Sequence, residues 1–65
     1  MAEAKFTNAI DAARRLGVPE AWLKREAHEG RVPHLRAGRR LLFDVDQVRQ
    51  VLAQRAEQQA QEVTP

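Results

Sequence analysis

The basic side chains of this 65-residue sequence are concentrated in its middle. Residues 14–40 hold eight of the eleven Lys and Arg side chains and three of the nine acids, a net charge of +5, whereas residues 1–13 and 41–65 sum to −1 and −2. A basic centre between acidic ends favours binding of a polyanion at one place on the protein. An ordinary solvated surface with scattered arginines is the alternative interpretation. Six cations of this block are candidates for phosphate contacts: Lys24, Arg25, Arg31, Arg36, Arg39 and Arg40.

One segment separates its cations from its acids in a helical pattern. Four residues follow the i, i+3, i+4, i+7 spacing that places side chains on one face of a helix: Ala21, Lys24, Arg25 and His28. Glu26 and Glu29 fall outside this stripe. A small residue near the helix start permits close approach to base edges, and Lys and Arg behind it reach guanine edges or phosphates. The stripe favours a DNA-reading helix over an ordinary charged face.

The sequence lacks the residues that several other chemistries need. It has no cysteine or serine, and its only side-chain hydroxyls are on Thr7 and Thr64, so we predict no catalytic residue and no enzyme. His28 and His34 make a poor metal site, and the 36–40 loop lacks a Gly-Lys-Ser/Thr ending, so neither a metal nor a cofactor is predicted. No apolar run exceeds three residues, against about 20 for a membrane span. The first residues lack the apolar stretch of a signal peptide, and we expect a cytoplasmic protein without membrane contact.

Local signals predict two short helices joined by a tight turn. Thr7 or Asn8 caps the first helix, and Gly17 ends it because glycine tolerates left-handed backbone dihedrals. The second helix starts with Pro19 in its first turn and is closed by Gly30. The first helix has an apolar stripe at helical spacing: Ile10, Ala13 and Leu16. This arrangement is a helix-turn-helix.

The residues after the two helices follow a different sequence pattern. Two short apolar pieces, 32–35 and 41–43, flank a basic loop around Gly38 and predict a β-hairpin. Asp44 then caps a third helix, whose apolar stripe fades after Leu52.

The composition divides the chain into three parts. Residues 1–5 are predicted as a flexible N-terminus, and residues 6–52 as one domain. Residues 53–65 are predicted as a helical extension that frays into a disordered tail by residue 63. Because this extension has little to bury, we predict that it is dispensable for folding and simple DNA binding but needed for a protein partner.

From Phe6 to Leu52 the chain resembles the small excisionase-type, MerR-like winged helix-turn-helix family. The motifs that carry the resemblance occur in one collinear order: Asp11-Ala12-Ala13, Leu16-Gly17-Val18, Glu29-Gly30-Arg31-Val32-Pro33, and Gly38-Arg39-Arg40 followed by Leu41-Leu42-Phe43. The resemblance implies a mostly α fold with a small β-hairpin wing, in the order α-α-β-β-α. It also implies that the second helix enters the major groove and that the wing lies against the backbone or minor groove. The candidate DNA-binding residues are Glu20, Ala21, Trp22, Lys24, Arg25 and His28 on the helix, and Arg36, Gly38, Arg39 and Arg40 on the wing.

The sequence departs from the family's pattern at four positions. The departures are Pro19 for a capping serine, Trp22 for a small hydroxyl residue, Glu26 for an apolar residue and Leu42 for a polar one. Trp22 is predicted either to donate to a phosphate or to pack against the wing. Glu26 is predicted to weaken an already small core, and Leu42 to add an apolar side chain to the outer face of the hairpin.

The function that the resemblance implies is sequence-specific binding of double-stranded DNA. Within that class it favours a recombination directionality factor that binds and bends attachment-site DNA and assists an integrase. A small transcription regulator and a phage DNA-packaging subunit remain as alternatives, and a protein-interaction module docking on an acidic partner is an alternative from another class. Because one small module discriminates poorly alone, we expect monomers that bind adjacent sites cooperatively, with Leu42 and Trp22 as neighbour contacts.

Overall fold

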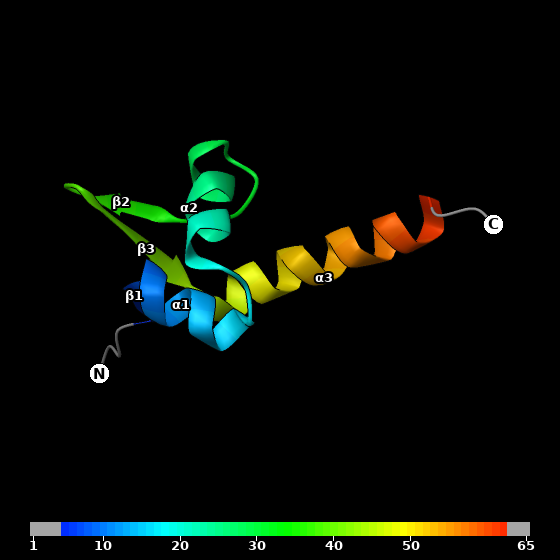
Figure 1. Cartoon of the computed structure of the whole chain (residues 1–65), viewed down its shortest axis with the longest axis horizontal. Coiled ribbons are helices and arrows are strands. Elements are labelled where there is room, and N and C mark those ends of the chain that lie inside the picture. Colours follow the sequence, from blue (N-terminus) through cyan, green and yellow to red (C-terminus); the bar gives the residue numbers. More distant parts are fainter. Residues whose placement is uncertain (1–4, 63–65) are drawn as a thin grey trace.

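The computed structural model describes residues 5–62, which form three helices and a three-stranded antiparallel sheet (Figure 1). The elements are β1 (Phe6–Asn8), α1 (Ala9–Leu16), α2 (Glu20–His28), β2 (Leu35–Ala37), β3 (Arg40–Asp44) and α3 (Val45–Glu62). The predicted fold class, mostly helical with a hairpin wing, is confirmed, with β1 as an additional strand. The predicted flexible N-terminus, apart from Lys5, and the predicted disordered end at 63–65 lie outside the described residues.

The helix-turn-helix follows from its capping residues. The Asn8 side chain accepts a hydrogen bond from the Asp11 backbone N–H at 2.7 Å, so Asn8 is the cap of α1. Gly17 ends α1 with φ of 75°, and its N–H donates to the Ala13 carbonyl at 2.8 Å. Pro19 was predicted inside the first turn of α2, but it is the N-cap, so the helix begins one residue later, at Glu20. A proline fits there because it has no N–H to leave unpaired.

The sheet joins the start of the chain to the wing. Its strand order is β1-β3-β2, so β3 pairs with both neighbours, with Phe6 opposite Asp44 and Leu35 opposite Leu42. Gly38, with φ of 63°, makes the turn between β2 and β3. The sequence did not predict β1, because three residues with a single apolar side chain carry no strand pattern and the pairing partner lies far along the chain.

The core is small and rich in alanine. Phe43, Leu23 and Val48 are fully buried, each worth about 1.5–3 kcal/mol of burial, and α1 contributes only Ala9, Ala12 and Ala13 as buried residues. The predicted α1 stripe is wrong at Ile10, which is 56% exposed. Small α1 residues allow α1 and α2 to pack closely, and α1 also packs against β3, so α1 links α2 to the sheet.

Glu26, which is predicted to weaken the core, is buried there with two arginine partners. It is the only buried charged residue within residues 5–60, at 4% exposure, and both of its carboxylate oxygens accept hydrogen bonds. Arg31 donates from Nε and Nη2 to its two oxygens at 2.9 Å, and Arg55 donates from Nη1 at 2.9 Å. These bonds, those of Arg31 above all, lower the pKa of Glu26 to about 2, because they favour the carboxylate more than burial disfavours it.

The third helix continues beyond the core. Val48 is buried and Leu52 packs against the core, and α3 then projects away from the other elements (Figure 1). Helix α3 runs through residue 52 without a break as far as Glu62. Arg55, which belongs to the predicted extension, reaches back to Glu26 on α2.

Candidate nucleic-acid interface

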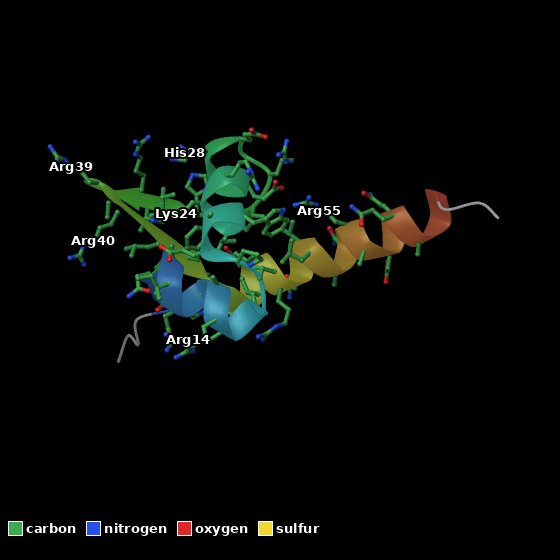
Figure 2. The ribbon with its side chains drawn as sticks, viewed as in Figure 1. Arg14, Lys24, His28, Arg39, Arg40 and Arg55 are labelled. Atoms are coloured by element: carbon green, nitrogen blue, oxygen red, sulfur yellow. The ribbon has the colours of Figure 1, made fainter. Side chains whose placement is uncertain are left out.

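A cationic groove lies between α2, the β2–β3 wing and the start of α1 (Figure 2). It brings together six of the ten candidate DNA-binding residues: Glu20, Lys24 and His28 from α2, and Arg36, Arg39 and Arg40 from the wing. These residues come from segments up to 20 positions apart, and the fold places them around one hollow. The groove thus carries four Lys and Arg side chains against one carboxylate.

The geometry of α2 explains which residues face the groove. At about 100° per residue, Glu20, Lys24 and His28 share one side of the helix, and Trp22 and Glu26 share the opposite side. Ala21 and Arg25 are exposed on the side turned away from the buried Leu23 and Ala27. The exposed side of α2 and its groove side are adjacent. All members of the predicted stripe are therefore accessible to a ligand that covers both.

Lys24 is already paired inside the groove. Its Nζ lies 3.0 Å from Oε2 of Glu20, and the two side chains are 51% and 38% exposed. An exposed pair of this kind contributes about 0–1 kcal/mol, so Lys24 can exchange Glu20 for a phosphate at little cost. Freed from Lys24, the Glu20 carboxylate is an acceptor suited to the amino group of cytosine.

The wing presents its arginines from three backbone positions. Arg36 lies on β2, Arg39 in the turn beside Gly38, and Arg40 at the first position of β3. All three are exposed, and Figure 2 shows Arg39 at the tip of the hairpin with Arg40 next to it. Arginines on a rigid two-stranded projection suit phosphate contacts, because little backbone ordering is needed on binding.

Arg31 does not belong with the groove cations. Its guanidinium bonds to Glu26 and also contacts the carboxylate of Glu29. Two carboxylates around one guanidinium leave it little attraction for a phosphate. The number of cations available for phosphate contacts falls from six to five: Lys24, Arg25, Arg36, Arg39 and Arg40.

Trp22 occupies a position that the sequence did not predict. Its half-buried ring lies beside α3, with the guanidinium carbon of Arg55 5.7 Å from the ring centroid. This distance is within the range of a cation–π contact. The ring therefore packs between α2 and α3, on the side of α2 opposite the groove.

Four residues that line the groove were missed by sequence reasoning. They are Asn8, Ala9, Ile10 and Leu41. Ile10 was assigned to the core because its spacing matches a buried stripe, whereas the buried face of α1 is rotated onto Ala9, Ala12 and Ala13. An exposed apolar side chain within a cationic groove offers a contact for a thymine methyl group.

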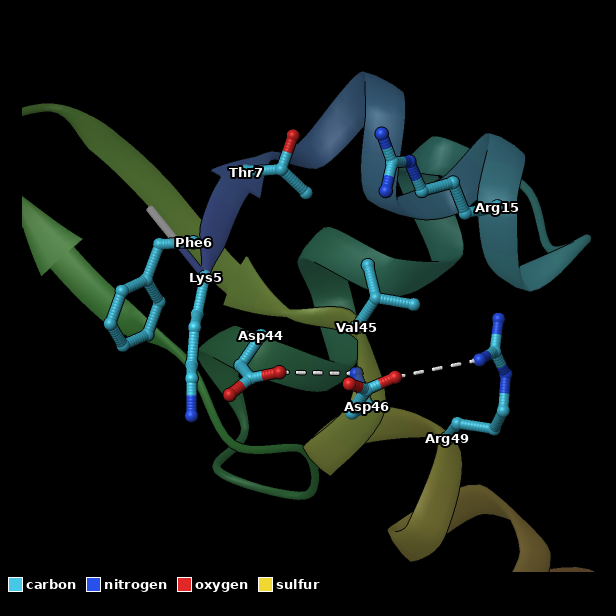
Figure 3. Close-up of a pocket in the computed structure, with 8 residues that line it drawn as sticks. All are labelled: Lys5, Phe6, Thr7, Arg15, Asp44, Val45, Asp46 and Arg49. Carbon is cyan, nitrogen blue, oxygen red and sulfur yellow. Dashed lines mark hydrogen bonds and ion pairs between the residues drawn. The ribbon is translucent and has the colours of Figure 1, made fainter. Parts of the chain in front are cut away.

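A second hollow, at the junction of β1 and the start of α3, carries charges of both signs (Figure 3). Asp44 accepts a hydrogen bond from the Asp46 N–H at 3.1 Å, which confirms it as the cap of α3, and Asp46 lies 3.7 Å from Arg49. Arg15 pairs with Asp11 at 3.0 Å. Because these charges compensate one another, the hollow does not resemble a polyanion site. It is lined by Lys5, Phe6, Thr7, Arg15, Asp44, Val45, Asp46 and Arg49.

The described residues carry neither a cluster of metal ligands nor a membrane-spanning helix. Residues 5–62 contain no group of three or more His, Cys, Asp or Glu side chains placed to hold a metal ion. In the same part of the chain, no helix has the length and apolar character needed to cross a membrane.

The helix pair, the arginine-bearing hairpin and the groove between them define a winged helix-turn-helix protein. The family model described as "Helix-turn-helix domain" matches residues 9–56, which is about three quarters of the chain. The chain belongs to this family, a DNA-binding family that includes excisionase-like proteins. The matched segment runs from the first residue of α1 to one position beyond Arg55. Neither the curated proteins nor the solved structures contain a match.

Proposed function

We propose that this protein binds double-stranded DNA sequence-specifically, with α2 in the major groove and the β2–β3 wing against the neighbouring backbone. The observation that carries the proposal is the groove itself, in which one face of α2 and three wing arginines surround the same hollow. A helix is narrow enough to enter the major groove, and a cationic projection beside it fits the phosphates that border that groove.

The two parts of the site have different roles in this proposal. Lys24 and Arg25 reach guanine edges or nearby phosphates, and Ala21 allows the helix to approach the bases closely. The wing arginines neutralise phosphates, which adds affinity without reading sequence. His28 sits one turn beyond Lys24 on the groove side and extends the contact along the duplex.

Within this class we propose an excisionase-type role, in which the protein binds attachment-site DNA, bends it and assists an integrase in the cytoplasm. The family's inclusion of excisionase-like proteins supports this role. A helix in one groove and a wing beside it grip the duplex at two points, which favours bending. A transcription regulator or a DNA-packaging subunit would use the same groove. The genes beside the coding sequence distinguish them: an integrase, a promoter or a terminase.

The general proposal is tested by the salt dependence of binding to a labelled mixed-sequence duplex of about two helical turns. Five neutralised phosphates give a log–log slope of about −4.5, and four give about −3.6 if Lys24 stays with Glu20. Between about 50 and 200 mM salt the affinity then falls roughly 150- to 500-fold. Absence of binding at the lower salt concentration would refute the proposal and favour a protein-interaction module that docks on an acidic partner.

The excisionase role needs a separate test. A preferred site is first recovered by selection from random duplexes. The position-dependent mobility of circularly permuted fragments carrying that site then measures bending. We expect a bend centred on the site, and an unbent site would favour the packaging or regulatory alternatives.

A further inference from the structure

Two of the four departures from the family's pattern meet at one place in the fold. Trp22 and Glu26 are four residues apart on α2, on the side opposite the groove, and both contact Arg55 of α3. Arg55 is 29 positions from Glu26 in the sequence. Its guanidinium donates to Oε1 of Glu26 at 2.9 Å, and its carbon lies 5.7 Å from the centroid of the Trp22 ring.

This cluster is better built than a surface ion pair. Glu26 is 4% exposed, and the Arg55 side chain is 29% exposed. Without Arg55, the buried Glu26 carboxylate would keep only Arg31 as a cationic partner in a poorly solvated place, so the contact is costly to break. A planar guanidinium can donate to a carboxylate and stack on an indole at the same time, which an ammonium group cannot do equally well.

The cluster also gives α3 a contact beyond the core. Leu52 is the last α3 residue that packs against the core, and one further turn brings Arg55 beside α2. Helix α2 is short, and Leu23 and Ala27 are its only fully apolar buried residues. Two buried apolar side chains and the half-buried Trp22 are few contacts to fix the tilt of a nine-residue helix. The Arg55 contact adds a further point of attachment on the side away from the groove.

We propose that Arg55 is a positioning residue for the recognition helix: by bonding Glu26 and covering Trp22, it fixes the orientation in which α2 presents Lys24 and Arg25 to DNA. The inference rests on the proposed DNA binding and adds to it a specific role for the first turn of the segment beyond residue 52. Arg55 acts through α2, since its guanidinium is occupied by a carboxylate and a ring and lies on the far side of α2 from the groove.

The test compares Arg55→Ala with Arg49→Ala in the full chain. Arg49 is on the same helix, is 59% exposed and has only the 3.7 Å contact with Asp46, so its replacement removes the same charge without loosening α2. The probes are the duplex recovered by selection and a mixed-sequence duplex, measured below the melting transition of each variant. For Arg55→Ala, the affinity for the selected duplex divided by the affinity for the mixed-sequence duplex is expected to fall roughly tenfold. This lies within the range of about 2- to 30-fold that couplings through packed networks produce. For Arg49→Ala the ratio should stay unchanged.

The salt slope distinguishes positioning from direct contact. A positioning residue leaves the number of neutralised phosphates unchanged, so the slope for Arg55→Ala should equal that of the unmodified protein. A slope smaller by about 0.9 would mean that Arg55 itself meets a phosphate, and would overturn the proposal. An affinity ratio equal to that of Arg49→Ala would overturn it also, by reducing Arg55 to a stabilising role.

A conservative variant covers the case in which Arg55→Ala does not fold. Arg55→Lys keeps the charge beside Glu26 but loses the simultaneous stacking on Trp22, so its affinity ratio should fall less than that of the alanine variant. An unchanged ratio in Arg55→Lys would then overturn the proposal. If the unmodified protein binds neither duplex, the proposed DNA binding is refuted, and the positioning role is refuted with it.

Discussion

Replacing both Arg39 and Arg40 with alanine should flatten the salt dependence of DNA binding without changing sequence preference. Each lost phosphate contact lowers the log–log slope by about 0.9, so the double variant is expected at roughly −2.7 instead of −4.5. Between about 50 and 200 mM salt, its affinity then falls about 40-fold, whereas that of the unmodified protein falls about 500-fold. The loss should be the same on selected and mixed-sequence duplexes, because wing contacts to the backbone carry little base information.

The assay is fluorescence anisotropy with a labelled duplex at four or more salt concentrations. The matched control is Arg14→Ala with Arg49→Ala, which removes two exposed arginines from α1 and α3. Figure 2 shows Arg14 on the side of the molecule away from α2 and the wing. The reasoning is wrong if the control changes the slope as much as the wing variant does, since net charge alone would then govern binding. It is also wrong if the wing variant loses affinity for only one of the two duplexes.

Three further predictions concern the helix, the buried carboxylate and the sheet. Lys24→Ala should weaken the selected site by about 1–3 kcal/mol more than mixed-sequence DNA, and equal losses in the same anisotropy assay would remove its base-reading role. Because the pKa of Glu26 is lowered from 4.5 to about 2 by its bonds to Arg31 and Arg55, its contribution to stability is complete above pH 4.5 and is lost as the pH falls toward 2. In circular-dichroism melts, Tm of the unmodified protein should therefore drop across that interval more than Tm of Glu26→Gln, while Glu57→Gln, at an exposed position, should follow the unmodified protein. Leu42 lies on the sheet face opposite the buried Phe43 and pairs with Leu35, which is 46% exposed. Leu42→Thr should therefore lower cooperative binding to a duplex with two sites and leave the affinity for a single site unchanged. Unchanged cooperativity would exclude this face as the neighbour contact.

Local signals were enough to predict the helix-turn-helix and the wing. Asn8, Gly17 and Gly38 specify a cap, a helix end and a hairpin turn through their own backbone and side-chain preferences. These signals act over four residues or fewer. They can be recognised without the tertiary structure, whereas the groove between α2 and the wing is formed by the packing of distant segments.

The remaining features depend on contacts between distant residues. Strand β1 exists because β3 pairs with it, and Glu26 is tolerated in the core because Arg31 and Arg55 bond to it. Comparison with the family's pattern predicted that Glu26 weakens the core, and its partner on α3, 29 positions away, has no local signature that could have been recognised. Helical periodicity placed Ile10 in the core, although the face of α1 that is buried is the neighbouring one, with Ala9, Ala12 and Ala13.

Because β3 is the central strand, the sheet can close only after β3 has been synthesised on the ribosome. Phe6 precedes its partner Asp44 by 38 positions, so at about 5–20 residues per second β1 waits roughly 2–8 s for the strand that it joins. Helix and hairpin formation take about 10 μs or less, so synthesis and not folding limits when the sheet closes. Because isolated helices of eight or nine residues are marginal in water, α1 and α2 stay weakly formed until β3 supplies Phe43 to the core. A translational pause inside β3 would hold the nascent chain in that state, with Phe6 and Leu42 not yet brought together in one sheet.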